Sequence, residues 1–396
     1  MLMSSRTLSW LSAGMLFVAP ILAHAEDIER EFAVDPGGLL FIDSDAGAIE
    51  INTWDENRVR LLIRNVDSFD VEVEQRSDGI YVVAESQRRL FNFGSSNLSF
   101  RVDVPRQFNL DLDTGGGRID VGDLTGSVRA DTSGGSISIG RITQGNVLVD
   151  TSGGRITILD VEGNVEADTS GGNIDIGNVT GNVLADTSGG RITIGDVGGN
   201  ISADTSGGSI DVGTSGGRVL LDTSGGTIRA AWAQGPIEAD TSGGNIYLDG
   251  SATSVKADTS GGNIVIEASD GPVQADTSGG NITIRRSRAA IEADTSGGRI
   301  DAELLVVSPG TNASITLESS GGDITLRLPA SHAATVNAEL SLSRRGFGSH
   351  SIFTDFPLSI QEEDDYIIAR GDINGGGDPV RLRTSNSDIH IIRVDE

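Results

Sequence analysis

Aspartate recurs in this sequence at a fixed interval, as the first residue of the phrase Asp-Thr-Ser-Gly-Gly. The interval is 18 residues after a single step of 19. If each copy lies above the preceding one, neighbouring carboxylates stand about 5 Å apart and repel each other. Such a column must either hold a cation or serve the turn that carries it. The ten repeat aspartates are Asp131, Asp150, Asp168, Asp186, Asp204, Asp222, Asp240, Asp258, Asp276 and Asp294.

Two interpretations of this aspartate column are open. In the first, each carboxylate accepts hydrogen bonds from backbone N–H groups of its own Ser-Gly-Gly turn. In the second, calcium lies between successive turns, as in the glycine- and aspartate-rich nonapeptide rolls. The roll motif Gly-Gly-x-Gly-x-Asp-x-apolar-x is absent, and only one aspartate per period is regular. We therefore favour turn capping, keep the ten aspartates as calcium candidates, and expect no other cofactor.

Catalytic chemistry has weaker support in the sequence. Some parallel β-helices cleave acidic polysaccharides with carboxylates, calcium and a basic residue on one outer face, and the outward slots here also alternate in charge. Those slots hold Arg155, Asp175, Arg191, Asp211, Arg299 and Asp301. Charges on a solvated face usually serve solubility, and the three histidines after residue 25 (His332, His350 and His390) lie outside the repeats without a partner motif. We therefore predict a protein that is not an enzyme.

Short strands are the elements that must position the aspartates. In the copy that begins at Asp186, polar and apolar residues alternate over residues 191–194 and again over 200–203. Alternation with a period of two is typical of strands that bury one face. Val197 stands between the two segments, flanked by glycines, and is expected to form a third short face. Residues predicted to point inward are Ile192, Ile194, Ile201 and Ala203, and those predicted to point outward are Arg191, Thr193 and Ser202.

The fixed period indicates stacked copies of one supersecondary unit. A flat meander would leave its Ile and Val face in water, whereas a coil stacks each unit on the last and buries that face. We therefore predict an all-β fold, a β-solenoid (β-helix) of 18-residue rungs with N- and C-terminal β capping regions. Between Asp204 and Asp222, Thr-Ser-Gly-Gly occurs a second time at 214–217, which suggests that the two halves of a rung are related.

The chain divides into four segments. Residues 1–25 read as a secretory signal peptide, with an apolar run from Leu8 to Leu22 and a small-x-small cleavage site. Residues 26–105 lack the repeat and are predicted to cap the first rung, because an open sheet end invites aggregation. Residues 106–328 form the predicted solenoid, and residues 329–396 a C-terminal cap with modified rungs. Strands are expected in the N-terminal region at Leu39–Ile42, Ala48–Asn52, Val59–Ile63, Phe69–Glu74, Ile80–Ala84 and Leu98–Val104.

The composition excludes several classes of partner. A formal net charge of −28 opposes binding to nucleic acid and to anionic membrane surfaces. The sequence contains no cysteine, so stability cannot come from disulfides. After signal cleavage, no apolar run has the length that a membrane span requires. These features are typical of an acidic exported protein in the periplasm, outside the cell or at its surface.

Three groups of motifs carry a resemblance to a known family. They are the periodic Ser-Gly-Gly-x-Ile-x-Ile turns, the opening residues 38–55 with Gly-Leu-Leu-Phe-Ile and Trp-Asp, and the closing residues 380–391, Val-Arg-Leu-Arg-Thr-Ser-Asn-Ser-Asp-Ile-His-Ile. With them the chain resembles the bacterial putative-adhesin family of β-strand-repeat proteins, a domain of unknown function. The resemblance covers nearly the whole mature chain. It implies a cell-envelope or extracellular location and an adhesive role, and it supplies no catalytic residues.

Together these observations predict a structural or adhesin-like β-solenoid. Its repetitive surface would bind a cell-envelope protein, a glycan or another surface partner, because many weak identical contacts add through multivalency. Two alternatives stay open: a calcium-stabilised module similar to a β-roll, and a β-helix similar to the polysaccharide lyases. The sequence does not determine the oligomeric state.

Overall fold

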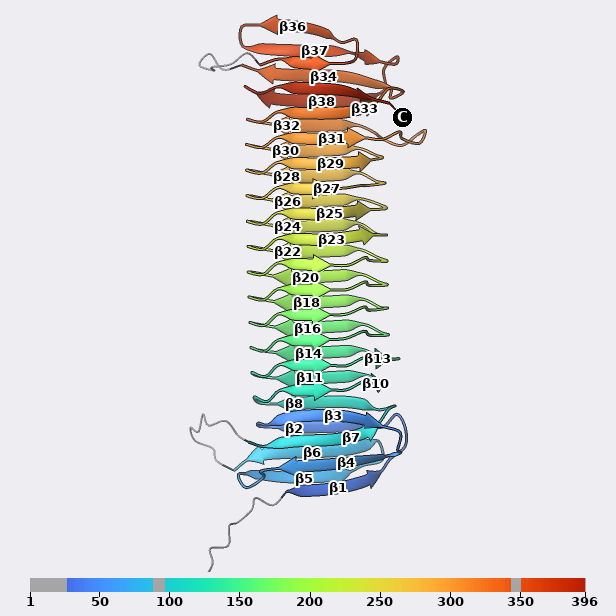
Figure 1. The fold of residues 1–396 in the computed structure, drawn as a ribbon, viewed down its shortest axis with the longest axis vertical. Coiled ribbons are helices and arrows are strands. Elements are labelled where there is room, and N and C mark those ends of the chain that lie inside the picture. The colour runs from blue at the N-terminus through green and yellow to red at the C-terminus, as the bar shows by residue number, and fades with distance from the viewer. Residues whose placement is uncertain (1–26, 88–96, 343–349, 396) are drawn as a thin grey trace, which may run out of the picture.

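The chain folds into a rod built of two long sheets that face each other (Figure 1). The structure, a computed structural model, describes residues 27–87, 97–342 and 350–395, and the predicted signal peptide lies outside them. Within these ranges the protein is all-β, and each regular rung gives one strand to each sheet. The prediction of a β-solenoid is therefore confirmed. The described residues also include no helix with the length and hydrophobicity needed to cross a bilayer.

The strands of the regular rungs are short, and those near both ends of the rod are longer. Sheet A contains β1 (Ile28–Ala33), β3 (Ala48–Trp54), β4 (Arg58–Arg64), β7 (Ser99–Pro105), β9 (Ile119–Val121), β12 (Ile137–Ile139), β15 (Ile156–Ile158), β17 (Ile174–Ile176), β19 (Ile192–Ile194), β21 (Ile210–Val212), β23 (Ile228–Ala233), β25 (Ile246–Ser251), β27 (Ile264–Ile266), β29 (Ile282–Ser287), β31 (Ile300–Leu304), β33 (Ile324–Pro329), β35 (Ile352–Thr354) and β39 (Ile389–Val394).

Sheet B contains β2 (Leu39–Ser44), β5 (Phe69–Gln75), β6 (Gly79–Ser86), β8 (Asn109–Thr114), β11 (Val128–Thr132), β14 (Val147–Thr151), β16 (Val165–Thr169), β18 (Val183–Thr187), β20 (Ile201–Thr205), β22 (Val219–Thr223), β24 (Ile237–Thr241), β26 (Val255–Thr259), β28 (Val273–Thr277), β30 (Ile291–Thr295), β32 (Ile315–Ser319), β34 (Ala334–Ser341), β36 (Ser359–Glu363), β37 (Tyr366–Ile373) and β38 (Asp378–Ser385). A small pair, β10 (Leu124–Thr125) and β13 (Ile142–Thr143), lies outside both sheets.

Successive copies of the repeat pair in parallel and in register. Asp186 of β18 lies between Asp168 of β16 and Asp204 of β20. In sheet A, Ile192 lies in the same way between its equivalents in β17 and β21. The single 19-residue step leaves this register intact, because the extra residue is accommodated beside Gln144, which has a φ of 54°.

The core is a column of aliphatic side chains between the sheets. Ile192, Ile194, Ile201 and Ala203 are at most 2% exposed, as the alternation predicted. Val197 is also buried, and isolated parallel bridges connect it to Val179 and Ser215 in the adjacent rungs, so the predicted third short face is present. Full burial of one branched aliphatic side chain contributes about 1.5–3 kcal/mol.

The second glycine of each turn is required by close stacking. A Cβ added at Gly190 would lie 1.8 Å from the carbonyl oxygen of Gly172 in the rung before. At the first glycine, Gly189, the nearest atoms would be 3.9 Å away. The two glycines of Ser-Gly-Gly therefore differ: only the second lets adjacent turns approach to this distance.

Both ends of the rod depart from chain order. The rung β2–β3 lies between β6–β7 and β8–β9, with all these strands parallel. The rung β38–β39 likewise lies between β32–β33 and β34–β35. Antiparallel strands then close the ladders, namely β1, β4 and β5 at one end and β36 and β37 at the other.

The N-terminal region therefore does more than cap the first rung. The six strands predicted there correspond to β2–β7, and β1 precedes them. Two of its strand pairs are rungs that continue the solenoid, and only the antiparallel strands terminate it.

Candidate functional face of the solenoid

The outward residues of sheet B form three columns that run along the rod axis. On β18, Asn182 precedes the strand, Leu184 points outward from its middle, and Asp186 points outward near its end. The parallel register repeats this arrangement in the neighbouring rungs. We call the three rows the asparagine column, the middle column and the aspartate column.

The carboxylates of the aspartate column have almost no partners within the protein. None of the ten repeat aspartates forms an ion pair with another described residue, although twenty ion pairs occur elsewhere in the described ranges. The hydrogen bond from Gln274 Nε2 to Asp276 Oδ2, at 3.1 Å, is the one recorded for this column within those ranges.

Threonine, rather than aspartate, bonds the turn. The buried Thr187 Oγ1 donates to the carbonyl oxygen of Gly172 at 2.9 Å and accepts the N–H of Gly190 at 3.3 Å. The same pair of bonds recurs in the other regular rungs that the structure describes. The expectation that each aspartate caps its own Ser-Gly-Gly turn is therefore wrong, because the adjacent threonine already occupies that position from the buried side.

Burial and neighbouring charges raise the pKa of several carboxylates in the aspartate column. Partial burial against the sheet raises the pKa of Asp168 and Asp204, and the charges of neighbouring aspartates raise it further. The pKa is raised, with burial as the largest cause, at Asp113, Asp150, Asp168, Asp204, Asp240, Asp276 and Asp294. The fold therefore holds these carboxylates in a setting that disfavours their charged form.

Each rung offers a calcium ion one carboxylate of this column. Among the described residues, no three carboxylate or imidazole side chains converge as a metal-binding group. Calcium takes six to eight oxygen ligands, so an ion between rungs would need backbone carbonyls and waters in addition. Calcium binding by the ten repeat aspartates stays a hypothesis, for which a test is given below.

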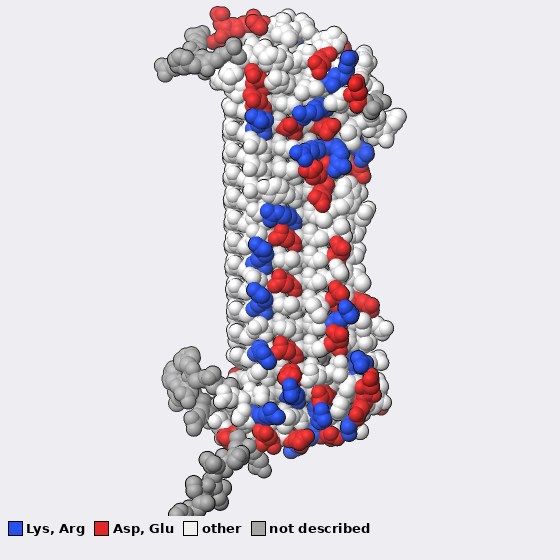
Figure 2. Space-filling model, in the orientation of Figure 1, with Lys and Arg blue, Asp and Glu red and all other residues white. Residues whose placement is uncertain are grey.

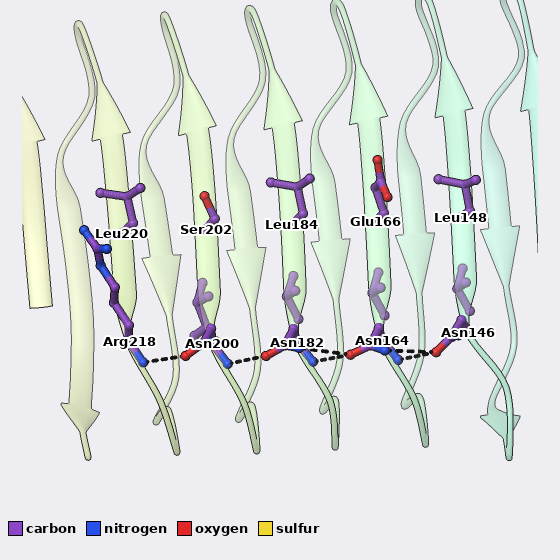
Figure 3. Close-up of a pocket in the computed structure, with 14 residues that line it drawn as sticks. Asn146, Leu148, Asn164, Glu166, Asn182, Leu184, Asn200, Ser202, Arg218 and Leu220 are labelled. Atoms are coloured by element: carbon purple, nitrogen blue, oxygen red, sulfur yellow. Dashed lines mark hydrogen bonds between the residues drawn. The ribbon is translucent and has the colours of Figure 1, made fainter. Parts of the chain in front are cut away.

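The asparagine column is bonded internally. Asn164 donates its backbone N–H to Asn146 Oδ1 at 2.9 Å and its side-chain amide to the same atom at 3.2 Å (Figure 3). The ladder continues through Asn182 and Asn200 and ends where the N–H of Arg218 bonds to Asn200 Oδ1 at 2.8 Å. Each side-chain oxygen of this ladder accepts a backbone N–H from the next rung, whereas the described oxygens of the aspartate column accept none, so the asparagine column stabilises the stack and the aspartate column does not.

A shallow groove of about 550 Å³ follows the asparagine and middle columns over β14, β16, β18, β20 and β22 (Figure 3). Three leucines project from its floor in alternate rungs: Leu148, Leu184 and Leu220 are 39%, 47% and 38% exposed. Glu166 and Ser202 occupy the rungs between them. The sequence analysis did not identify this groove, although leucine in an outward slot at 36-residue intervals was a usable signal.

Five of the six charged slots considered for a lyase form ordinary surface ion pairs. Arg155 and Asp175 lie 3.9 Å apart, and Asp211 pairs with Arg229 at 3.4 Å. Arg299 pairs with Asp323, Asp301 pairs with Arg327, and the N–H of Arg191 bonds to Asn173 Oδ1. Figure 2 shows one face of the rod on which basic and acidic side chains stand beside each other along its length. Such pairs neutralise one another.

The three histidines lie in the C-terminal part of the rod. His332 is 7% exposed, and burial lowers its pKa. His350 lies beside Asp388, with 3.5 Å between Nδ1 and Oδ1, and His390 of β39 stacks on the ring of Phe353. Among the described contacts, none of these histidines pairs with both a nucleophilic hydroxyl group and a carboxylate, as a catalytic triad requires.

Fold and face together define a β-solenoid with a repetitive, partly unpaired outer surface. No protein-family model and no curated protein matches the sequence. Solved structures that align with it include a putative cell adhesion protein from Clostridium sporogenes, at 7% identity over 93% of this chain and 100% of that one, with a TM-score of 0.16. A putative adhesin from Bacteroides fragilis aligns at 16% identity over 70% and 97% of the two chains, with a TM-score of 0.22.

A putative lipid binding protein from Parabacteroides distasonis also aligns, at 18% identity over 70% of this chain and 96% of that one, with a TM-score of 0.23. Two of these three aligned structures are named as adhesion proteins. The fold assignment itself rests on the parallel register of this chain.

Proposed function

We propose that this protein is an exported, non-enzymatic β-solenoid that uses the outer face of sheet B to bind a partner at a surface, in the manner of an adhesin. The observation that carries the proposal is the aspartate column. Its ten carboxylates are stacked at a cost in repulsion and take no ion pair from the described residues. A charged row that the fold does not use is available to a ligand outside it.

The repetition of the face suits such a role. Successive rungs present the repeat aspartate in the same register, so a partner with a repeating structure can make equivalent contacts in many rungs. Equivalent weak contacts on one rigid scaffold add through effective concentration. Export is supported by the signal-like residues 1–25 of the sequence.

The experiment uses the mature chain, residues 26–396, on a glycan array and on immobilised extracellular matrix and envelope proteins. A matched variant lacks residues 240–275, which are two complete repeats, so its remaining rungs keep their register. We expect saturable binding without turnover and a weaker apparent affinity for the shortened rod. Absence of binding to every surface would contradict the proposal.

The same preparations distinguish the two alternative functions. A lyase would release unsaturated sugar ends that absorb in the ultraviolet from acidic polysaccharides. A calcium-stabilised roll would gain β-sheet signal in circular dichroism when calcium is added to the chelated protein. Either result would replace the adhesive function with the corresponding alternative.

A further inference from the structure

The groove on sheet B combines apolar and acidic features in a fixed geometry. Leu148, Leu184 and Leu220 occupy every second rung of the middle column. Since parallel strands are about 4.8 Å apart, successive leucines are separated by about 10 Å along the rod axis. The leucines are more than one third exposed, and they form a straight apolar row rather than a closed core.

The charge beside this row has one sign. Within the same five rungs, the aspartate column contributes Asp150, Asp168, Asp186, Asp204 and Asp222, and none of them takes an ion pair from the described residues. Glu166 adds another acidic group between two leucines. Arg218 is the basic residue of the groove lining, and Glu238 already holds its guanidinium at 2.8 Å.

These charges decide between the possible occupants. A second copy of this chain would bring a like-charged column against the aspartates, and the whole protein has a formal net charge of −28. An anionic bilayer would be repelled for the same reason. A basic partner would instead supply the counter-charges that the fold omits.

The spacing favours a helical partner. An α-helix rises about 10.5 Å over seven residues, so a helix parallel to the rod axis repeats one side of its surface at nearly the leucine interval. An apolar residue of such a helix would fit between Leu184 and Leu220, above the small Ser202, and a basic residue one heptad away would meet Glu166. The distance from Leu148 to Leu220 covers four rungs, about 19 Å, which corresponds to about 13 helical residues.

We propose that this groove is the docking site for a basic amphipathic helix of a partner protein. The helix lies along the rod axis, with its apolar face on Leu148, Leu184 and Leu220 and its Lys or Arg flank toward the aspartate column. This inference deepens the proposed function, since it names the partner class for one part of the binding face.

The test uses a synthetic 18-residue peptide with leucine at heptad-spaced positions and lysine on one flank, titrated into the mature chain by calorimetry (a length chosen to exceed the roughly 13 residues of the groove). Two control peptides have the same composition in scrambled order, or glutamate in place of lysine. We expect the designed peptide alone to bind, with an affinity that falls as salt increases, and to gain helicity on binding.

Variants of the protein locate the site. Leu184→Ser should weaken binding about tenfold, because a leucine contact of that size is removed from the interface. Asp186→Asn should weaken it about threefold and reduce the salt dependence. Matched controls are Leu159→Ser, at a leucine 51% exposed outside the groove, and Asp258→Asn, in the same column beyond it. Both controls should bind within twofold of the unmodified protein. All four positions are on the surface, so unchanged circular dichroism is expected.

Equal binding of the scrambled peptide would overturn the inference and leave only general attraction between opposite charges. Equal losses in the control variants would overturn it as well. If the mature chain binds glycans or matrix proteins but not the designed peptide, this inference fails and the proposed function stands. If the peptide binds but every surface assay is negative, the groove stands and the adhesive function fails.

Discussion

The two glycines of each turn should respond very differently to the same substitution. In Gly190→Ala, the new Cβ would lie 1.8 Å from Gly172 O, whereas real Cβ contacts essentially never fall below 3.0 Å. The two rungs must therefore separate locally by more than 1 Å. That movement breaks the bonds from Thr187 Oγ1 to Gly172 O and from Thr205 Oγ1 to Gly190 O, both 2.9 Å long.

The magnitude follows from these contacts. Loss of two hydrogen bonds contributes about 1 kcal/mol each, and overpacking adds about 1–3 kcal/mol. We therefore expect Gly190→Ala to lower the free energy of unfolding by about 4 kcal/mol. The control is Gly189→Ala, where the nearest atoms are 3.9 Å from the added Cβ. That variant should be neutral or more stable by up to about 1 kcal/mol, because alanine restricts the unfolded chain.

Urea unfolding followed by circular dichroism gives both free energies. Repeat proteins can unfold locally, so amide hydrogen exchange in β18 and β20 should accompany it and show lower protection in Gly190→Ala. Equal unfolding midpoints for the two alanine variants would refute the stacking argument, because that argument places the close contact with the rung before at Gly190 and not at Gly189.

Three further predictions test the other columns. Thr187→Val should lower the free energy of unfolding by about 1–3 kcal/mol, since Gly172 O and the Gly190 N–H lose their buried partner. Thr187→Ser should keep most of that stability, because Ser319 makes the same two bonds in its own rung. Equal urea midpoints for the two variants would contradict this prediction. Because the pKa values of Asp168 and Asp204 are raised by folding, the stabilisation from their protonated forms is complete below the unfolded-state pKa, near 4, and is lost as pH rises through the folded-state pKa. The double variant Asp168→Asn, Asp204→Asn should therefore melt above the unmodified protein at pH 7, and the gap should close on acidification; a gap independent of pH would exclude repulsion as its cause. If calcium lies between the repeat aspartates, thermal melting should shift upward in millimolar calcium relative to chelator, and an unchanged midpoint ends that hypothesis.

The regular rungs could be predicted from sequence because one local pattern repeats and every copy must satisfy the same neighbours. Alternation placed Ile192 and Ile201 in the core, and both are buried. The second Thr-Ser-Gly-Gly phrase shows the limit of this reasoning. By sequence Thr214 corresponds to Thr205, yet Ser215 is the buried residue that bonds to Gly199 O, and Thr214 instead donates to Asp196 Oδ1. The third short face, rather than the copied phrase, determines which hydroxyl turns inward.

The arrangement of strands at the ends of the rod was harder to predict from sequence, because chain order and spatial order differ there. Alternation predicted the positions of the strands. Nothing in the sequence of β2 indicates that it pairs with β6 and β8, and nothing in β38 indicates that it pairs with β32 and β34. Pairings between distant segments depend on which edges remain free once the regular rungs have formed. A local pattern contains no information about that choice.

The aspartate column is best understood by comparison with the asparagine column on the same face. In the asparagine column, each amide of residues 146, 164 and 182 bonds to the next rung, so stacking identical residues stabilises the coil. In the aspartate column, burial and the neighbouring charges raise the pKa of Asp168 and Asp204, and no repeat aspartate forms an ion pair among the described residues. Asparagine at residues such as Asp168 would satisfy the same backbone geometry without repulsion, so the requirements of the fold do not explain the carboxylate. Since the adjacent threonine already bonds the turn, the negative charge is available for the surface binding that we propose.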